Sequence, residues 1–461
     1  MPVQLPAGLL VSVSGVRGIV GENLTPEVVL AFAQALGTQL EGQPVVMGRD
    51  SRPSGEMFGD LVAAGLASSG CDVHDLGICP TPSVGVIIQH LRTGGGVQVS
   101  ASHNPSPYNG LKFFGDDGSV LGPEAGAVLL DVLHGGRRAR ADHAHVGQRL
   151  RHDLLLDESE VHYLDYADVH QDAILRHVDR GPLRQRRFRV LVDANHGAGG
   201  YLAERLLHTL GCEVDLLGDT PDGEFSHPPE PTEENLRDVA PRVLQGEADV
   251  GFALDPDADR LAIIDETGRY IGEELTLALA ARFLLARQPG AVVINMSSSR
   301  VTADLARQFG CPSHRSPVGE AHVVRRMRAE GAVLGGEGNG GVIDPRVGWV
   351  RDPFIGMALV LSLMAETGQP LSALVDSLPR YTIVKDKIQL EPAALTAFLG
   401  ALRRHWPDAE VNEEDGLRLE GPTWWLHARP SNTEPLVRII AEAPERAQAA
   451  ELVAAARRLC G

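Results

Sequence analysis

Three segments of this 461-residue chain repeat one pattern, and the repeat constrains the fold more than any other feature. They are VVMGRDSRPSGEMFGDLVAAGLASSGCDVHDLG from Val45, VLVDANHGAGGYLAERLLHTLGCEVDLLG from Val190 and VVINMSSSRVTADLARQFGCPSHRSP from Val292. Each reads as an apolar strand, a polar turn, an amphipathic helix and a Gly-Cys pair, where the glycine ends the helix in a left-handed conformation. Such units build parallel sheets covered by helices. The repeat therefore predicts three similar α/β domains.

The end of the chain has a different pattern. The segments RYTIVKDKIQL and GLRLEGPTWWLHARPSNTEPLVRIIAEA alternate as antiparallel strands do, and ERAQAAELVAAARRLC is typical of a helix. This predicts a smaller C-terminal α+β domain. We expect domain boundaries that give residues 1–150, 151–267, 268–372 and 373–461, each holding one of the loops described below.

Charge and cysteine content exclude several classes of partner. A formal charge of −19 disfavours nucleic acid and anionic membranes. The chain has no apolar run of about 18 residues, and its first residues lack the pattern of a secretory signal. Its five cysteines show no C-x-x-C spacing, which argues against a disulfide framework and a zinc site and suits a reducing cytoplasm. We expect a cytoplasmic protein without nucleic acid or membrane partners.

The first loop of interest lies in VSASHNPSPYNGLKFFG, where a strand-like run turns abruptly polar at Ser102. Pro105 and Pro107 restrict the backbone and so could hold this serine in place at low entropic cost. A serine alone is a poor nucleophile and needs activation or prior phosphorylation. Asn-Pro and Asn-Gly are also common turn dipeptides, so a plain turn stays open.

The second loop is DPDADR, which places carboxylates at Asp255, Asp257 and Asp259. These side chains can converge on one hard cation such as Mg²⁺, and without a cation or a basic partner they would repel one another. A calcium EF-hand is excluded because Arg260 stands where that loop needs glycine. A solvated acidic turn stays open.

The third loop, GGEGNGG, is rich in glycine, which lets backbone approach a ligand closely. Glu337 and Asn339 offer an acceptor and an amide there, a combination that suits sugar hydroxyls. Glycine-rich turns are common, so this pattern alone is weak.

The fourth loop, RPSNTEP, has the composition of a phosphate-binding turn. Arg429 supplies a forked cation, and the turn adds side-chain and backbone donors at Ser431, Asn432 and Thr433. A plain turn between two strands is the alternative.

In this order and spacing, the four loops resemble those of the α-D-phosphohexomutase superfamily, which contains phosphoglucomutases, phosphomannomutases and phosphoglucosamine mutases. The resemblance runs from SGVRGIVGENLTPE through MGRDSRPSG to RPSNTEP and so covers essentially the whole chain. It implies an α/β fold of three similar domains with mixed sheets, plus a C-terminal α+β domain, around a central cleft. It also implies an isomerase that interconverts hexose 6-phosphates and hexose 1-phosphates.

The resemblance assigns roles to individual residues. Ser102 matches a phosphorylated serine that is primed by hexose 1,6-bisphosphate and returns to that state after each turnover. Asp255, Asp257 and Asp259 match the carboxylates that hold Mg²⁺ together with an oxygen of the phosphorylated Ser102. The residues expected around the reacting group are His103, Lys112, Arg260 and Arg17. Those expected to bind the phosphosugar substrate are Glu337, Asn339, Arg429, Ser431, Asn432 and Thr433.

The choice of sugar and the assembly state stay open. Some relatives have a histidine where Glu320 falls, and INMSSSR lacks a lysine found in others. We favour glucosamine phosphate, with mannose or glucose phosphate as the alternative, and a homodimer is one option for assembly. A metal-dependent sugar phosphatase is an alternative from another class, although a hydrolase has no need of a second phosphate-binding loop.

Overall fold

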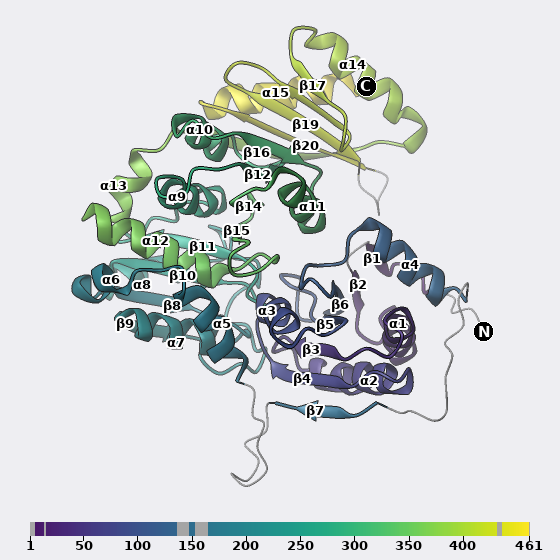
Figure 1. Cartoon of the computed structure of the whole chain (residues 1–461). Coiled ribbons are helices and arrows are strands. Elements are labelled where there is room, and N and C mark those ends of the chain that lie inside the picture. Colours follow the sequence, from purple (N-terminus) through teal and green to yellow (C-terminus); the bar gives the residue numbers. More distant parts are fainter. Residues whose placement is uncertain (1–4, 13–14, 136–146, 153–164, 431–435, 461) are drawn as a thin grey trace.

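A computed structural model describes residues 5–12, 15–135, 147–152, 165–430 and 436–460, which form four sheets (Figure 1). Three sheets mix parallel and antiparallel strands and carry helices, and the fourth is antiparallel. This confirms the expected fold class. Within the described ranges, no helix combines the length and the apolar character that a membrane crossing requires.

The first sheet has the strand order β1-β2-β6-β5-β3-β4-β7. Its strands are β1 (Leu10–Ser12), β2 (Gly15–Ile19), β3 (Val45–Arg49), β4 (Val73–Ile78), β5 (Gly95–Val99), β6 (Tyr108–Gly115) and β7 (Arg149–Arg151). Its helices are α1 (Pro26–Gln39), α2 (Gly55–Ser68), α3 (Thr81–Leu91) and α4 (Pro123–Leu133). As the first repeat predicts, α2 joins β3 to the parallel strand β4. The boundary expected at residue 150 falls within β7.

The second sheet has the order β11-β10-β8-β9 and the third the order β13-β12-β14-β15. The second contains β8 (Arg189–Asp193), β9 (Glu213–Leu217), β10 (Val250–Leu254) and β11 (Leu261–Asp265), with helices α5 (Tyr166–Leu175), α6 (Arg180–Arg186), α7 (Gly200–Leu210) and α8 (Ala240–Gln245). The third contains β12 (Val292–Asn295), β13 (Ser313–Ser316), β14 (Leu334–Glu337) and β15 (Gly341–Ile343), with helices α9 (Glu273–Leu285), α10 (Val301–Gln308), α11 (Glu320–Glu330), α12 (Pro353–Thr367) and α13 (Leu371–Asp376). Parallel pairs β8–β9 and β12–β13 confirm the other two repeats.

The Gly-Cys pairs of the repeats behave as expected. Gly211 follows α7 with φ 91° and Gly310 follows α10 with φ 67°, the left-handed region that glycine adopts without steric cost. The cysteines after them, Cys212 and Cys311, are buried. These cysteines therefore act as small core residues.

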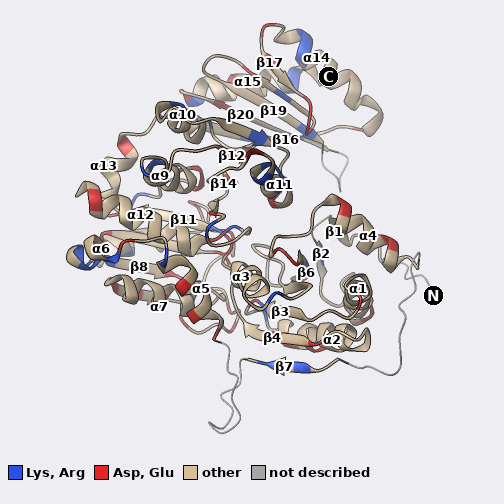
Figure 2. Cartoon of the chain, viewed as in Figure 1, with Lys and Arg blue, Asp and Glu red and all other residues tan. Residues whose placement is uncertain are grey.

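The fourth sheet has the antiparallel order β16-β20-β19-β18-β17 and lies at the top of Figure 1. Its elements are β16 (Thr382–Gln389), η1 (Pro392–Ala394), α14 (Leu395–His405), β17 (Glu410–Asn412), β18 (Leu417–Glu420), β19 (Trp425–Pro430), β20 (Leu436–Ala443) and α15 (Arg446–Leu459). Figure 2 shows a basic segment on β16, which carries Lys385 and Lys387. The boundary expected at residue 372 falls inside α13, and the chain enters this sheet only at Thr382.

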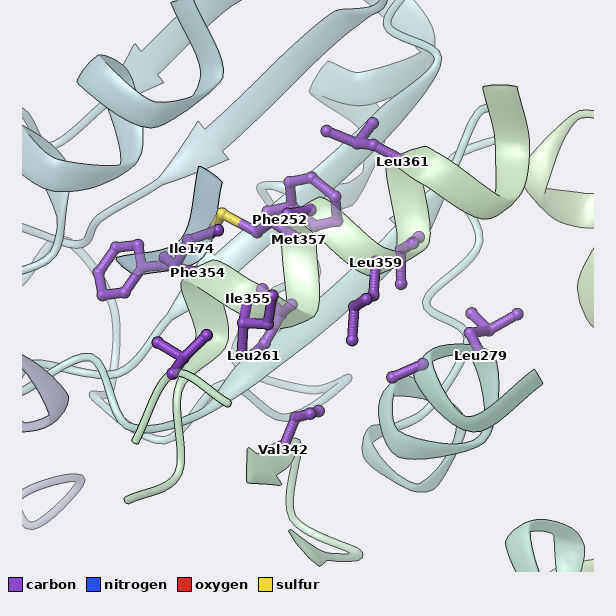
Figure 3. Packing of buried hydrophobic residues seen from close by; sticks show 14 of the residues in the cluster. Ile174, Phe252, Leu261, Leu279, Val342, Phe354, Ile355, Met357, Leu359 and Leu361 are labelled. Carbon is purple, nitrogen blue, oxygen red and sulfur yellow. The ribbon is translucent and has the colours of Figure 1, made fainter. Parts of the chain in front are cut away.

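Helix α12 is the centre of the largest core. Every residue from Pro353 to Met364 is buried, so this helix is apolar on all sides, as an interior helix must be. We call each sheet together with its helices a unit. Figure 3 shows α12 packed among side chains of the second and third units, including Phe252 and Leu279. The carboxylate of Asp352 caps its N-terminus, accepting from the N–H of Phe354 at 2.8 Å. The residue before the cap therefore has a fixed position at the junction of several units.

Candidate active site

Ser102 lies in the turn between β5 and β6 and is 1% exposed. Its hydroxyl donates to Oδ2 of Asp255 at 2.9 Å, so the first two loops meet although they are far apart in sequence. Its backbone has φ 53°, which costs a non-glycine residue about 1–2 kcal/mol. The N–H of Ser102 donates to Oγ of Ser100 at 2.8 Å, a bond that helps to hold this conformation.

A buried arginine, Arg52, supports the serine loop. Its guanidinium donates to the carbonyl oxygens of Ser102 at 2.7 Å, Asn104 at 2.6 Å, Pro105 at 2.9 Å and Tyr108 at 3.0 Å. Its Nε donates to Oδ2 of Asp50 at 3.1 Å, which orients the guanidinium. The sequence reasoning missed this role. The available signal was the Asp-x-Arg spacing directly after the first repeated strand.

The carboxylates of Asp255, Asp257 and Asp259 lie between β10 and β11 and are fully buried. One oxygen of each falls within 4.8 Å of the others. In the described part of the chain, Oδ1 of Asp257 and Oδ1 of Asp259 are buried without a hydrogen-bond partner. Such oxygens need a partner, and a set of three carboxylates is the donor set that a hard divalent cation prefers. The residues present fit Mg²⁺.

Basic side chains compensate part of this negative charge. Lys112 Nζ lies 3.0 Å from Oδ2 of Asp257 and 2.7 Å from Oδ2 of Asp259, and an Nη of Arg351 lies 2.6 Å from the latter oxygen. Burial alone would raise the pKa of Asp259, but Arg351 and Lys112 lower it. For Asp255, burial and the neighbouring carboxylates raise the pKa well above its usual range. The negative charge of the three carboxylates is thus only partly compensated, and a further cation would be favoured there.

Arg351 also connects the acidic cluster to the third loop. Its Nη1 donates to Oε2 of Glu337 at 3.0 Å, while its Nη2 holds Asp259. Glu320 also binds Arg351. Its Oε1 accepts the backbone N–H of Arg351 at 2.8 Å, and its Oε2 lies 3.2 Å from Nε of Arg351. Sequence reasoning missed Arg351 and left the role of Glu320 open. The signal was a charged Arg-Asp pair directly before the apolar helix α12.

The other residues expected near the reacting group lie around Ser102. Nδ1 of His103 is 3.3 Å from the Ser102 hydroxyl, and burial, with Arg260 and Arg17, lowers the pKa of its imidazole to about 3. Nη1 of Arg17 donates to Oδ1 of Asn104 at 3.4 Å. Nε of Arg260 lies 3.9 Å from carboxylates of the acidic cluster and is a buried donor without a hydrogen-bond partner in the described residues. An unused donor of this kind suits an incoming anion.

A cleft of about 350 Å³ lies between the third loop and the fourth sheet. Glu337 and Asn339 line one side of it, and Arg429, at the end of β19, lines the other. Nε of Arg429 donates to Oδ1 of Asp415 at 2.8 Å. The remaining predicted phosphate-binding residues, Ser431, Asn432 and Thr433, lie outside the described residues. The structure therefore brings the third loop and the start of the fourth to one cleft.

The fold and the site define a four-domain enzyme of the phosphohexomutase type. The chain belongs to the phosphoglucomutase/phosphomannomutase family: models of its alpha/beta/alpha domains I, II and III and of its C-terminal domain match residues 8–135, 168–268, 272–381 and 384–459. This confirms the resemblance on which the residue roles depend.

Relatives match nearly end to end. The chain is 36% identical over 445 residues, 95% of each chain, to a probable phosphoglucosamine mutase of Methanopyrus kandleri. It is 36% identical over 453 residues, 96% of each chain, to a phosphoglucomutase/phosphomannomutase of Thermococcus kodakarensis. A crystal structure of a phosphoglucomutase/phosphomannomutase family protein from Burkholderia thailandensis superposes with a TM-score of 0.83 at 29% identity, covering 98% of this chain and 97% of that one. Because the names of these relatives specify different sugar phosphates, they do not decide which sugar phosphate is the substrate of this chain.

Proposed function

We propose that this enzyme interconverts hexose 6-phosphates and hexose 1-phosphates through a phosphorylated Ser102 and a hexose 1,6-bisphosphate. One observation carries the proposal: Arg351 bonds both to Asp259, in the cluster that holds the Ser102 hydroxyl, and to Glu337, in the cleft for the sugar. A phosphoryl carrier and a sugar site thus share one rigid connection.

Each half-reaction moves one phosphoryl group. A free hydroxyl of the sugar phosphate forms a bond to the phosphorus on Ser102, and the bond from phosphorus to Oγ breaks. The proton of the attacking hydroxyl ends on Oγ of Ser102, so the products are a bisphosphate and a free serine. The bisphosphate then turns in the cleft and returns its other phosphoryl group to Ser102 by the reverse reaction.

The chain contributes charge and position to this transfer. Lys112 and Arg260 lie where charge on the phosphoryl oxygens needs compensation, which is the main requirement of such reactions. Asp255, Asp257 and Asp259 would hold Mg²⁺ with an oxygen of the phosphorylated Ser102, and the ion supplies further positive charge when bound. In the unphosphorylated protein, burial and the nearby Arg260 and Arg17 keep the imidazole of His103 neutral beside the serine.

The cleft between the third loop and the fourth sheet, called the distal cleft below, would hold the phosphate that is not being transferred. Arg429 is the described member of the predicted phosphate loop, and Lys385, Lys387 and Arg438 add cations to the same wall. Glu337 and Asn339 stand on the opposite wall for the sugar hydroxyls. Fixing both ends of the sugar aligns the reacting oxygen, an effect worth up to about 7–11 kcal/mol in well-oriented systems.

The test is turnover of glucose 1-phosphate, mannose 1-phosphate and glucosamine 1-phosphate, each with a trace of the matching 1,6-bisphosphate. We expect the 6-phosphate as product, and phosphopeptide mapping should find phosphate on Ser102. Ser102→Ala should abolish turnover, whereas Ser106→Ala, at an exposed position of the same loop, should not. Release of inorganic phosphate at the rate of substrate loss would instead identify a sugar phosphatase.

A further inference from the structure

The two walls of the distal cleft differ in charge. The wall from the fourth sheet presents the cations Lys385, Lys387, Arg429 and Arg438, in agreement with the basic segment on β16 in Figure 2. The facing wall, from the third unit, presents the carboxylates and amides Glu274, Asn295, Glu337 and Asn339. A phosphate therefore binds best at the first wall, and a positively charged substituent of the sugar binds best at the second.

Among the described residues, three carboxylates line this cleft, and two of them already have a cationic partner. Glu337 accepts from Arg351 at 3.0 Å, and Asp386 pairs with Arg457 at 2.5 Å. For Glu274, the described ranges of the chain contain no basic nitrogen within 4.0 Å of the carboxylate. Within the described chain, Glu274 is thus the cleft carboxyl group that has no ion-pair partner.

Glu274 is held directly against the third loop, which carries Glu337 and Asn339. It stands in the first turn of α9, and its Oε2 accepts the N–H of Ser299 at 2.8 Å. A Cβ atom at Gly338 would lie 2.1 Å from each carboxylate oxygen, so the glycine between Glu337 and Asn339 makes room for this side chain. The carboxylate therefore belongs to the same surface as the residues expected to bind the sugar.

The surroundings of Glu274 favour an incoming cation. Burial raises the pKa of its carboxyl to about 8, and the bond from Ser299 and the nearby charge of Lys385 offset this only in part. A positive group against the carboxylate would restore its ionised form. Neutral sugar hydroxyls offer no such charge, and Asn339 on the same wall can bind them, since its Oδ1 has no hydrogen-bond partner in the described residues.

We propose that Glu274 binds the ammonium group of a 2-amino-2-deoxyhexose phosphate and so makes amino sugar phosphates the preferred substrates. This inference rests on the proposed phosphohexomutase function. Glu320 does not serve this purpose, because both its oxygens are engaged by Arg351 and it is not among the described residues that line the cleft.

The experiment compares Glu274→Gln with Glu273→Gln. Glutamine keeps an oxygen for the Ser299 N–H but removes the charge, and Glu273 is the adjacent glutamate, which does not line the cleft as described. We expect the wild type to have its highest kcat/KM with glucosamine 1-phosphate. Glu274→Gln should lose about tenfold or more with this substrate, the worth of one hydrogen bond between charged groups, and less than about threefold with the glucose and mannose phosphates. Glu273→Gln should leave all three values unchanged.

Two results would overturn the inference while leaving the mutase function intact: equal losses on all three sugars in Glu274→Gln, or a wild type that prefers glucose or mannose phosphate. Failure to isomerise any of the three would reject the mutase function itself. Calorimetry still tests the ammonium contact in that case. Wild-type protein should bind glucosamine 6-phosphate more tightly than N-acetylglucosamine 6-phosphate, which lacks the charge, and Glu274→Gln should abolish this difference. Equal affinities in the wild type would contradict the contact.

Discussion

Replacing Arg52 with lysine should remove hydrogen bonds that hold the loop of Ser102 while keeping the positive charge. The guanidinium donates to four carbonyl oxygens of the loop and to Asp50. An ammonium group has three donors, so if one stays with Asp50, at least two of the carbonyl bonds are lost. At about 1.5 kcal/mol for each bond to a charged group, the loop loses about 3 kcal/mol. Ser102 can then relax from its left-handed conformation.

We expect kcat of Arg52→Lys to fall roughly 100-fold, because about 3 kcal/mol corresponds to that factor in rate. KM should change little, since Arg52 does not line the distal cleft in the described structure. Steady-state assays of the hexose phosphate isomerisation measure both constants. Arg237→Lys is the matched control, because that arginine side chain is 74% exposed. A kcat of Arg52→Lys within about threefold of the wild type would refute the argument.

Three further predictions concern the acidic cluster, the distal cleft and the fourth domain. Asp257→Asn should reduce turnover about 100-fold or more while the circular dichroism spectrum is unchanged, since the cation site loses a charge; near-normal turnover across a Mg²⁺ titration would reject the metal assignment. Arg429→Ala should raise KM about tenfold with a smaller change in kcat, and an unchanged affinity for the sugar phosphate would count against the phosphate role of this loop. His427 is buried, and burial lowers the pKa of its imidazole to about 4, below the unfolded value of about 6.5. The unfolded state therefore binds more protons between these pH values, so stability falls by up to about 3 kcal/mol as pH drops from 6.5 to 4. The urea midpoint of His427→Gln should fall less over this range, and identical slopes for the two proteins would contradict the assignment.

Four of the site residues that the sequence predicts lie at or just beyond the ends of strands. Ser102 follows β5, Asp255 follows β10, Glu337 ends β14 and Arg429 lies near the end of β19. Each position is marked locally by a change from an apolar run to a polar loop. Residues beyond the carboxyl ends of strands in α/β sheets commonly form ligand sites, so the first three of these loops could be identified without knowledge of the domain arrangement.

The supporting arginines could not be found in this way, because their partners are distant in the chain. Arg52 binds the carbonyl of a residue 50 positions away, and Arg351 binds Asp259 across 92 positions. A buried arginine also looks like a surface one in sequence, since its burial depends on carboxylates and carbonyls that only the folded structure brings near. The role of Glu320 was open for the same reason: its partner is Arg351.

The position of Arg351 follows from core packing and from a chain of buried hydrogen bonds. Its neighbour Asp352 caps the apolar helix α12 and also lies 2.9 Å from Nε2 of His170, in α5. Nδ1 of His170 lies 2.9 Å from the hydroxyl of Ser83, in α3. Because a carboxylate can only accept, Nε2 carries a proton and donates to Asp352. One side chain from each of the first three units thus fixes the arginine that joins the acidic cluster to Glu337, so the alignment of carrier and sugar depends on how the units pack and not on the loops alone.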